Sequence, residues 1–303
     1  MKKRNVMIVA VVVALSMLTL VAFAGTEAYI GYETFKDVLR NQDSELTAGS
    51  GKVAIEVTDN NQEILKVNGT FSGDHTEENM SGNLNIEAGS LVKSLQLFGS
   101  NNTMYIFDND NDNVYYANHT EDDYEKYDHH KGHDEFDKNS EAVLDFFMGD
   151  LKSEFNLVND QDGSQDIEFE LTKDEMPAII NLLSSLDHDK GDYSNEYDHS
   201  DLDVEAYPLF KEFKEANIEL PELTDEVVVE YLSLVLDLNT EKRVEGLSFE
   251  MAVSGLDADG QAHDLSVKAS FELSETILLE EMPSLDGKTL IELPEEEFED
   301  HRR

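Results

Sequence analysis

The sequence of 303 residues contains no cysteine. This absence excludes disulfide bonds, a cysteine nucleophile and lipid attachment at a cysteine. Basic residues are scarce, because 22 Lys and Arg stand against 67 Asp and Glu, a formal net charge of -45. Such a charge repels nucleic acids and anionic lipid surfaces, so neither is an expected partner. The hydrophobic fraction of 40% is ordinary, and stability must come from a normal core.

Familiar catalytic motifs are absent as well. The chain has no Gly-x-Ser-x-Gly elbow, no phosphate-binding glycine loop and no His-Glu-x-x-His. With 67 carboxylates, the choice of any two as an acid and base pair would be arbitrary. The sequence therefore predicts that the protein is not an enzyme. A hydrolase without a local motif is the open alternative, because catalytic groups need not be close in sequence.

The acidic residues are spread over the polar positions of apolar-patterned segments, and are not gathered in one block. In concentrated salt the repulsion between carboxylates is screened, and their hydration keeps the surface soluble. This distribution favours adaptation to salt-rich or alkaline surroundings. Cation binding is the alternative explanation of the same charge.

The first 24 residues have the layout of a bacterial signal peptide. Three basic residues at 2–4 precede an apolar stretch, which ends at Ala22-Phe23-Ala24. Small residues in an A-x-A pattern are typical of a cleavage site, so residues 1–24 are predicted to be removed on export. In the alternative, residues 6–22 stay as an uncleaved membrane anchor, because the apolar stretch approaches the length of a membrane span. Either outcome predicts a secreted or cell-surface protein.

The apolar residues change period along the chain. Within 26–40 the apolar residues Tyr32, Phe35, Val38 and Leu39 have a helical spacing. Alternation from Lys52 to residue 117 then predicts a meander of about six strands, with Asp59, Asn60 and Asn61 in its first turn. Further helices are expected at 140–151, 174–186 and 206–216, and the last third of the chain contains three long alternating segments. Two strongly acidic stretches, 119–139 and 187–203, are predicted to be exposed loops.

Together these patterns predict an α+β protein. Its centre is a curved, mostly antiparallel, half-barrel-like sheet of about nine to eleven strands, covered by about three or four short helices. Residues 25–280 are expected to form a single domain and residues 281–303 an acidic tail.

A weak internal repeat supports this plan. Gly31-Tyr-Glu-Thr-Phe-Lys and Tyr207-Pro-Leu-Phe-Lys each precede a group of alternating strands. The order of elements over residues 27–275 resembles the LolA and LppX-like family of bacterial lipoprotein carriers, and exported proteins of Gram-positive bacteria have a similar rhythm. The resemblance implies a curved sheet that holds an apolar ligand against a helical lid. It carries no signature residue, and the lipidation cysteine of the LppX-like branch is missing.

One face of the expected sheet is the candidate ligand site. Its large apolar side chains are expected to line a cleft for an acyl chain, a lipid or another apolar small molecule, or alternatively to fill a solid core. The candidate residues are Phe71, Leu84, Leu234, Phe249 and Phe271.

Histidines in the first acidic loop are the candidate metal site. His129, His130 and His133 have spacings that suit weak binding of Zn or Ni, although a solvated hydrophilic loop is the favoured explanation. The alternating Asp and Asn residues at 108–113 resemble the start of a calcium loop, but lack its glycine and its final glutamate. They are therefore predicted to form a hairpin turn, with weak Ca binding as the alternative. No cofactor is expected.

The leading functional prediction is a non-enzymatic, exported protein that binds an apolar or lipid-like ligand. The alternative is an envelope or extracellular interaction protein, whose sheet is a scaffold and whose acidic, His-rich loops bind divalent metals weakly. The sequence leaves the oligomeric state open.

Overall fold

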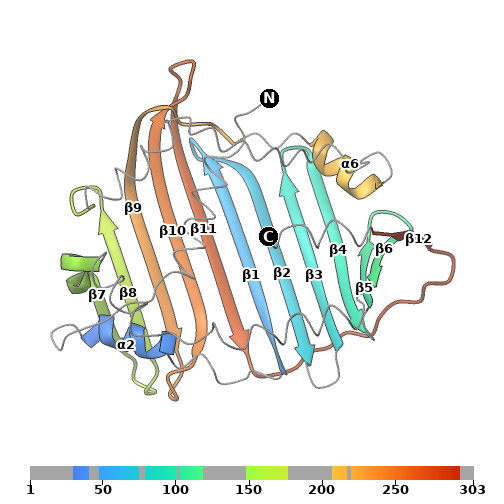
Figure 1. The fold of residues 1–303 in the computed structure, drawn as a ribbon, viewed down its shortest axis with the longest axis horizontal. Helices are drawn as coiled ribbons and strands as arrows, with labels where there is room; N and C mark the ends of the chain where they lie inside the picture. The colour runs from blue at the N-terminus through green and yellow to red at the C-terminus, as the bar shows by residue number, and fades with distance from the viewer. Residues whose placement is uncertain are drawn as a thin grey trace, which may run out of the picture.

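The computed structural model describes residues 30–40, 48–74, 79–100, 103–118, 148–176, 207–216 and 220–293. These residues form one open sheet of twelve strands in the order β12-β6-β5-β4-β3-β2-β1-β11-β10-β9-β8-β7 (Figure 1). All neighbouring strands are antiparallel except β12, which is parallel to β6. The strands are β1 Ala48–Asp59, β2 Gln62–Asp74, β3 Asn79–Ala88, β4 Leu91–Ser100, β5 Thr103–Asp108, β6 Asn113–Asn118, β7 Phe155–Asn159, β8 Gln165–Thr172, β9 Asp225–Leu238, β10 Val244–Leu256, β11 Ala262–Ser274 and β12 Thr289–Glu292.

Two meanders are joined at the centre of this sheet. Strands β1 to β6 follow one another on one side, and β7 to β11 do so on the other. The pairing of β1 with β11, called the seam below, runs without a register shift from Ser50–Ser274 to Asp59–Leu265. Hairpins of the first meander use the predicted turn residues: Asn60 and Asn61 have φ of 50° and 63°, a conformation that asparagine tolerates well.

Because the side-chain period of a strand is two, the sheet has two chemically different faces. The apolar face contains the five predicted ligand-site residues, and the opposite polar face contains mainly Ser, Thr, Asn, Glu and Lys. The helix α2 (Ile30–Arg40) packs against β7 and β8, and α6 (Pro208–Glu215) lies at the other end of the sheet (Figure 1). Amphipathic helices thus cover both ends of the apolar face.

The main core lies under α2. Tyr32, Phe35 and Val38 are buried on the inner side of this helix, as the helical spacing predicts. The ring of Phe155 on β7 lies 5.2 Å from that of Tyr32 and 5.0 Å from that of Phe35, and it also contacts Phe169 at 4.6 Å. Buried aromatic pairs at these distances contribute beyond their area, by about 0.5–1.5 kcal/mol each.

The polar face is covered in one region by the strap, defined here as residues 275–288. Backbone N–H groups of Leu278 and Glu280 donate hydrogen bonds of 2.9 Å to the hydroxyls of Ser72 and Ser81. Farther along, Leu285 packs on an aromatic cluster that breaks the polar pattern of this face; the cluster consists of Phe98, Tyr105, Phe107 and Val114. The strap then leads into β12, which extends the sheet beside β6.

Several details differ from the sequence predictions. The sheet has twelve strands, more than the nine to eleven expected. The additional strand is β12, which lies inside the predicted tail of 281–303 and is held by pairing with β6. Within the described residues there are two α-helices and a short 3₁₀ helix, η1 (Gly149–Glu154), fewer than expected. The other expected helices fall largely on 140–147 and 177–186, outside the described residues.

Residues 1–24 and 294–303 also lie outside the described residues, as do the two predicted acidic loops. Among the helices that the structure does describe, none has the length and apolar character needed to span a bilayer.

A buried histidine links the two strands at one end of the seam. His263 on β11 is 6% exposed, and its Nδ1 lies 2.8 Å from Oδ2 of Asp59 on β1. Its Nε2 lies 3.4 Å from Oδ2 of Asp257 in the preceding turn. Burial lowers the pKa of His263, but the hydrogen bonds and charges of the two carboxylates outweigh it, so the pKa is raised. The His263 side chain thus joins the two central strands.

This histidine predicts a pH-dependent stability. A raised pKa stabilises the folded state below the ordinary pKa of about 6.5, and that contribution is lost as the pH rises through the folded-state pKa. Urea unfolding from pH 6 upward should therefore show that the advantage of the wild type over His263→Gln is largest at pH 6 and shrinks at higher pH. An advantage that is constant over this range would contradict the proposed ion pairs.

Candidate functional site

The five predicted ligand-site residues lie on the same face of the sheet. In the strand register, Leu234 is directly opposite Phe249, and Phe271 is directly opposite Val53. Phe71 reaches across β1, and its ring stacks on that of Phe271 with centroids 5.4 Å apart and planes 17° apart. The structure therefore brings these side chains together on one apolar face, while their role in binding stays a prediction.

The apolar face is continuous across the central strands. One row of paired positions crosses from β9 to β3 and consists of Leu234, Phe249, Ala269, Ile55, Val67 and Ile86. The neighbouring row is Leu236, Leu247, Phe271, Val53, Gly69 and Leu84. Apart from glycine, every side chain in the two rows is apolar, so the face offers an uninterrupted surface to a hydrocarbon.

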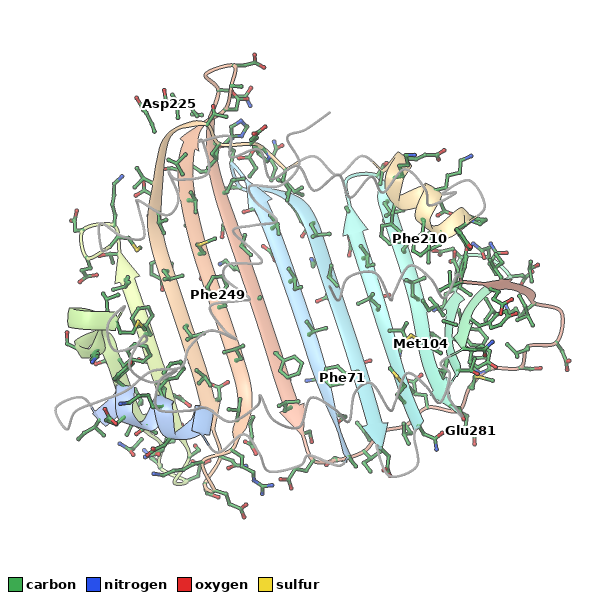
Figure 2. All side chains as sticks on the ribbon, viewed as in Figure 1. Phe71, Met104, Phe210, Asp225, Phe249 and Glu281 are labelled. Atoms are coloured by element: carbon green, nitrogen blue, oxygen red, sulfur yellow. The ribbon has the colours of Figure 1, made fainter. Side chains whose placement is uncertain are left out.

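The centre of this face is less buried than its ends. Leu171 and Tyr115, in the regions of α2 and α6, are 0% exposed. Phe71, Phe249 and Phe271, between those regions, are each only partly buried. Figure 2 shows Phe71 and Phe249 on the middle strands, in the interval between the two helices. The site is therefore an apolar strip with a closed core at each end.

Glycines allow large side chains to lie flat along the strip. A Cβ at Gly51 would be 2.2 Å from Cζ of Phe71, so the phenyl ring occupies the space above this glycine. A Cβ at Gly69 would be 2.9 Å from Cγ1 of Val53. In a strand interior, glycine is costly unless its missing side chain makes room for a neighbour. Here it makes room for the stacked pair of phenylalanines.

Helix α6 is fixed at the edge of the strip by polar contacts. The backbone N–H of Leu209 donates a hydrogen bond of 3.0 Å to the hydroxyl of Tyr115. Glu212, one turn later, lies 2.7 Å from Nζ of Lys93, which also lies 2.9 Å from Oδ2 of Asp108. Lys93 is 4% exposed, and the Asp108 side chain is fully buried. A buried cation thus connects the helix to β4 and β5.

The partners of Lys93 favour its charged form. Burial lowers its pKa, but hydrogen bonds and charges from Glu212 and Asp108 outweigh that effect and raise the pKa above its usual value. Sequence reasoning did not single out this residue. The signal was present, because Lys93 stands at an apolar-phase position between Leu91 and Leu95. A charged residue at such a position points to a buried partner.

The Asp and Asn run at 108–113 forms the turn between β5 and β6, as predicted. Asp108 accepts hydrogen bonds from the Asp110 backbone N–H and from the Asn111 side chain, at 3.0 and 2.6 Å. Its carboxylate is directed to this turn and to Lys93. Within the described part of the chain, no group of three His, Asp or Glu residues is arranged to hold a metal. His129, His130 and His133 lie outside that part.

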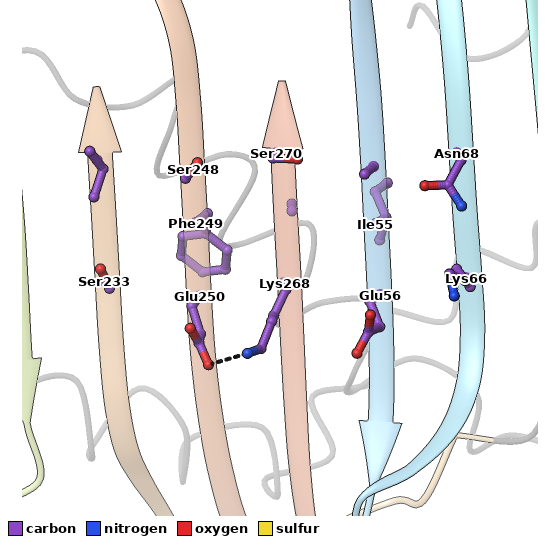
Figure 3. Close-up of a pocket in the computed structure, with 13 residues that line it drawn as sticks. Ile55, Glu56, Lys66, Asn68, Ser233, Ser248, Phe249, Glu250, Lys268 and Ser270 are labelled. Carbon is purple, nitrogen blue, oxygen red and sulfur yellow. Dashed lines mark ion pairs between the residues drawn. The ribbon is translucent and has the colours of Figure 1, made fainter. Parts of the chain in front are cut away.

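The structure also shows a hollow that the sequence did not predict. It has a volume of about 400 Å³ and lies on the polar face, over β9, β10, β11, β1 and β2 (Figure 3). Ser233, Ser248, Ser270 and Asn68 are among the side chains that line it. In the sequence, the alternating polar residues indicated only a solvated surface. The pattern within one strand does not show that small side chains of five neighbouring strands lie side by side. Most of its lining residues belong to the polar face, but Phe249, one of the five predicted ligand-site residues, is also among them.

The stacked phenylalanines predict a specific sensitivity to a single methyl group. Gly51→Ala should destabilise the protein by about 1–3 kcal/mol, because the new Cβ must displace Phe71 or the strand itself. Gly73→Ala is the matched control in the next strand, where the nearest atom would be 3.8 Å away. Denaturant unfolding measures both. Equal losses of stability in the two variants would contradict the packing described.

The buried cation predicts a larger effect. Lys93→Met leaves the Asp108 carboxylate buried without its countercharge, and should lower the free energy of unfolding by about 3–5 kcal/mol. Lys288→Met is the control, because Lys288 makes a comparable 3.0 Å pair with the exposed Asp112. Exposed pairs contribute up to about 1 kcal/mol. Thermal or urea unfolding distinguishes the two cases, and a Lys93→Met effect no larger than the control would contradict the buried role.

Comparison with known proteins adds little to this geometry. No protein-family model and no curated protein matches the chain. Among solved structures it is similar to a LolA superfamily protein from Nitrosomonas europaea, with 9% identity, coverage of 84% of this chain and 96% of that chain, and a TM-score of 0.21. A second is the dehydratase domain of PpsC from Mycobacterium tuberculosis in complex with C12:1-CoA, at 11% identity, 81% and 84% coverage and a TM-score of 0.12. The expected resemblance to LolA thus has only a weak counterpart at the level of fold.

Proposed function

We propose that this protein is a non-enzymatic, exported binding protein, which holds an apolar or lipid-like ligand against the apolar face of its sheet. The observation that supports this most directly is the partly buried strip between α2 and α6. Its central side chains, Phe71, Phe249 and Phe271, are as large as those of the closed cores but retain exposed surface. Signal-like residues 1–24 support the exported location.

The chemistry of the strip selects the ligand class. Its two central rows contain neither a charged side chain nor a hydrogen-bonding one, so a polar ligand would lose its hydration without compensation. A hydrocarbon gains about 0.8 kcal/mol for each CH₂ that it buries. A chain of about ten buried methylenes would therefore gain about 8 kcal/mol before the cost of association. This range suits reversible binding.

The borders of the strip limit the kind of head group that the ligand can carry. Lys93 and its carboxylate partners lie at the α6 end, whereas the α2 end is closed by aromatic rings. The charge of Lys93 is already matched by Asp108 and Glu212, so this border does not attract an anionic head group. An apolar ligand with a neutral or small polar end fits this arrangement best.

The test compares two adjacent residues on opposite faces of β10. A neutral naphthylamine probe, which fluoresces in apolar surroundings, is titrated into the purified protein, and native mass spectrometry records any lipid that co-purifies. Phe249→Ser should weaken probe binding by about tenfold, equivalent to about 1.4 kcal/mol of lost apolar contact. Ser248→Ala should leave it unchanged. Both variants are first checked for cooperative unfolding.

Two outcomes would count against the proposal. One is an absence of both probe binding and co-purified lipid, which would leave the apolar face as a filled core. The sheet would then be a scaffold, the alternative expected from the sequence. The other is equal weakening by the two substitutions, which would show that the probe does not distinguish the faces.

A further inference from the structure

The polar face carries a ladder of alternating charge. Across β10, β11, β1 and β2 the directly paired residues are Glu250, Lys268, Glu56 and Lys66. A second, parallel row across β11 and β1 pairs Glu272 with Lys52. Figure 3 shows side chains of the first row side by side, with the ion pair between Glu250 and Lys268. The charges alternate along each row and also between the rows on each strand of the seam.

The two rows are balanced in charge, in a strongly acidic chain. It contains three lysines and three glutamates, whereas the whole sequence has 22 basic and 67 acidic residues. The charged groups are open to solvent: the side chains of Lys52, Glu272 and Lys268 are 68%, 64% and 56% exposed. The ladder is therefore an accessible set of six balanced charges, flanked by Glu63, which lies 3.3 Å from Lys66, and by Glu87, which is opposite Lys66 on β3.

The order of charges about the seam is self-complementary. A second copy, turned over by a two-fold axis parallel to the seam, places its β1 on β11 and its β11 on β1. Lys268 then faces Glu56 of the second copy, and Glu272 faces Lys52 of the second copy. The same rotation brings Glu250 opposite Lys66 of the second copy. Each of these six charges meets an opposite charge.

We propose that the polar face docks a second copy of this chain, in a symmetric face-to-face dimer with its axis along the β1–β11 seam. A two-fold interface uses the same patch on both subunits and so requires self-complementarity. Other arrangements of three lysines and three glutamates place like charges opposite each other, which costs several kcal/mol. Because stacked sheets cross at about 30°, residues far from the axis lose their alignment. The fit therefore depends on the four charges next to the axis, which are Lys52, Glu56, Lys268 and Glu272.

The existing ion pairs do not oppose this docking. Lys52 lies 2.7 Å from Glu272, and Lys268 lies 3.1 Å from Glu250, within the same sheet. Exposed pairs of this kind contribute only about 0–1 kcal/mol. The charged ends of these side chains can therefore turn to the facing copy at little cost. The partial removal of water from the interface strengthens the new contacts.

The hollow fits between the two charged rows. Its floor holds the small residues Ser248, Ser270, Ala54 and Asn68. In the dimer, Ser248 faces Asn68 of the second copy, so polar groups meet across a space that holds bridging water. Four strands at about 4.8 Å spacing, each contributing about eight residues, give about 500 Å² per copy. This area is at the lower end for specific interfaces and indicates a weak, reversible dimer.

The experiment uses charge reversal and mixing. Sedimentation velocity of the purified protein over a range of concentrations should show a monomer–dimer equilibrium. Lys268→Glu and Glu56→Lys, each made alone, put like charges together at two symmetric places, and each should weaken the dimer by about 100-fold. An equal mixture of the two variants should restore it, because each mutant residue then faces its opposite.

Mixing separates docking from folding. The like charges that each substitution creates within its own sheet are still present after mixing. A recovery of the dimer on mixing therefore cannot come from repaired contacts within one sheet. Lys173→Glu is the control, since Lys173 makes an exposed 2.7 Å pair with Glu230 away from the seam. If either variant unfolds, Glu272→Lys and Lys52→Glu provide a second complementary pair.

Three results would overturn the proposal. The wild type could remain monomeric at concentrations of several hundred micromolar. The dimer could survive both charge reversals unchanged. The mixed variants could stay monomeric although each is folded. None of these outcomes bears on the apolar ligand, because that site lies on the opposite face and is tested by probe binding.

Discussion

The pairing of β1 with β11 is the interaction on which the other features depend. It joins the two meanders, and its register is unbroken from Ser50–Ser274 to Asp59–Leu265. A slip of one residue would turn the side chains of one meander to the opposite face. The apolar strip, the stack of Phe71 on Phe271 and the charge ladder all need residues from both meanders at fixed relative heights. The same register therefore determines both faces.

Much of this arrangement follows from local patterns in the sequence. Alternation from Lys52 onward identified most of the strands, Asn60 and Asn61 marked a turn, and the spacing of Tyr32, Phe35 and Val38 predicted the buried side of α2. These features depend only on residues near one another in the chain. The five apolar candidates share a face for the same reason, because each stands at the inward phase of its own strand.

Features that depend on distant pairs were beyond such reasoning. β12 is a strand because β6 is available beside it, and its four residues have no strong pattern of their own. Lys93 is buried because Glu212 and Asp108 arrive from other parts of the chain. The polar ladder is visible only after the register is known, since Glu56, Lys66 and Lys268 are ordinary exposed positions when each strand is considered alone.

The seam also governs the order of events during synthesis. Lys52 and Glu272, which meet across it, are separated by 220 positions, and contacts between such distant residues make folding slow. β1 therefore leaves the ribosome long before β11 is synthesised. Until then, the β1 edge of the first meander has no strand to pair with. The sheet therefore cannot be completed until nearly the whole sequence has been synthesised, because β11 ends at residue 274 of 303.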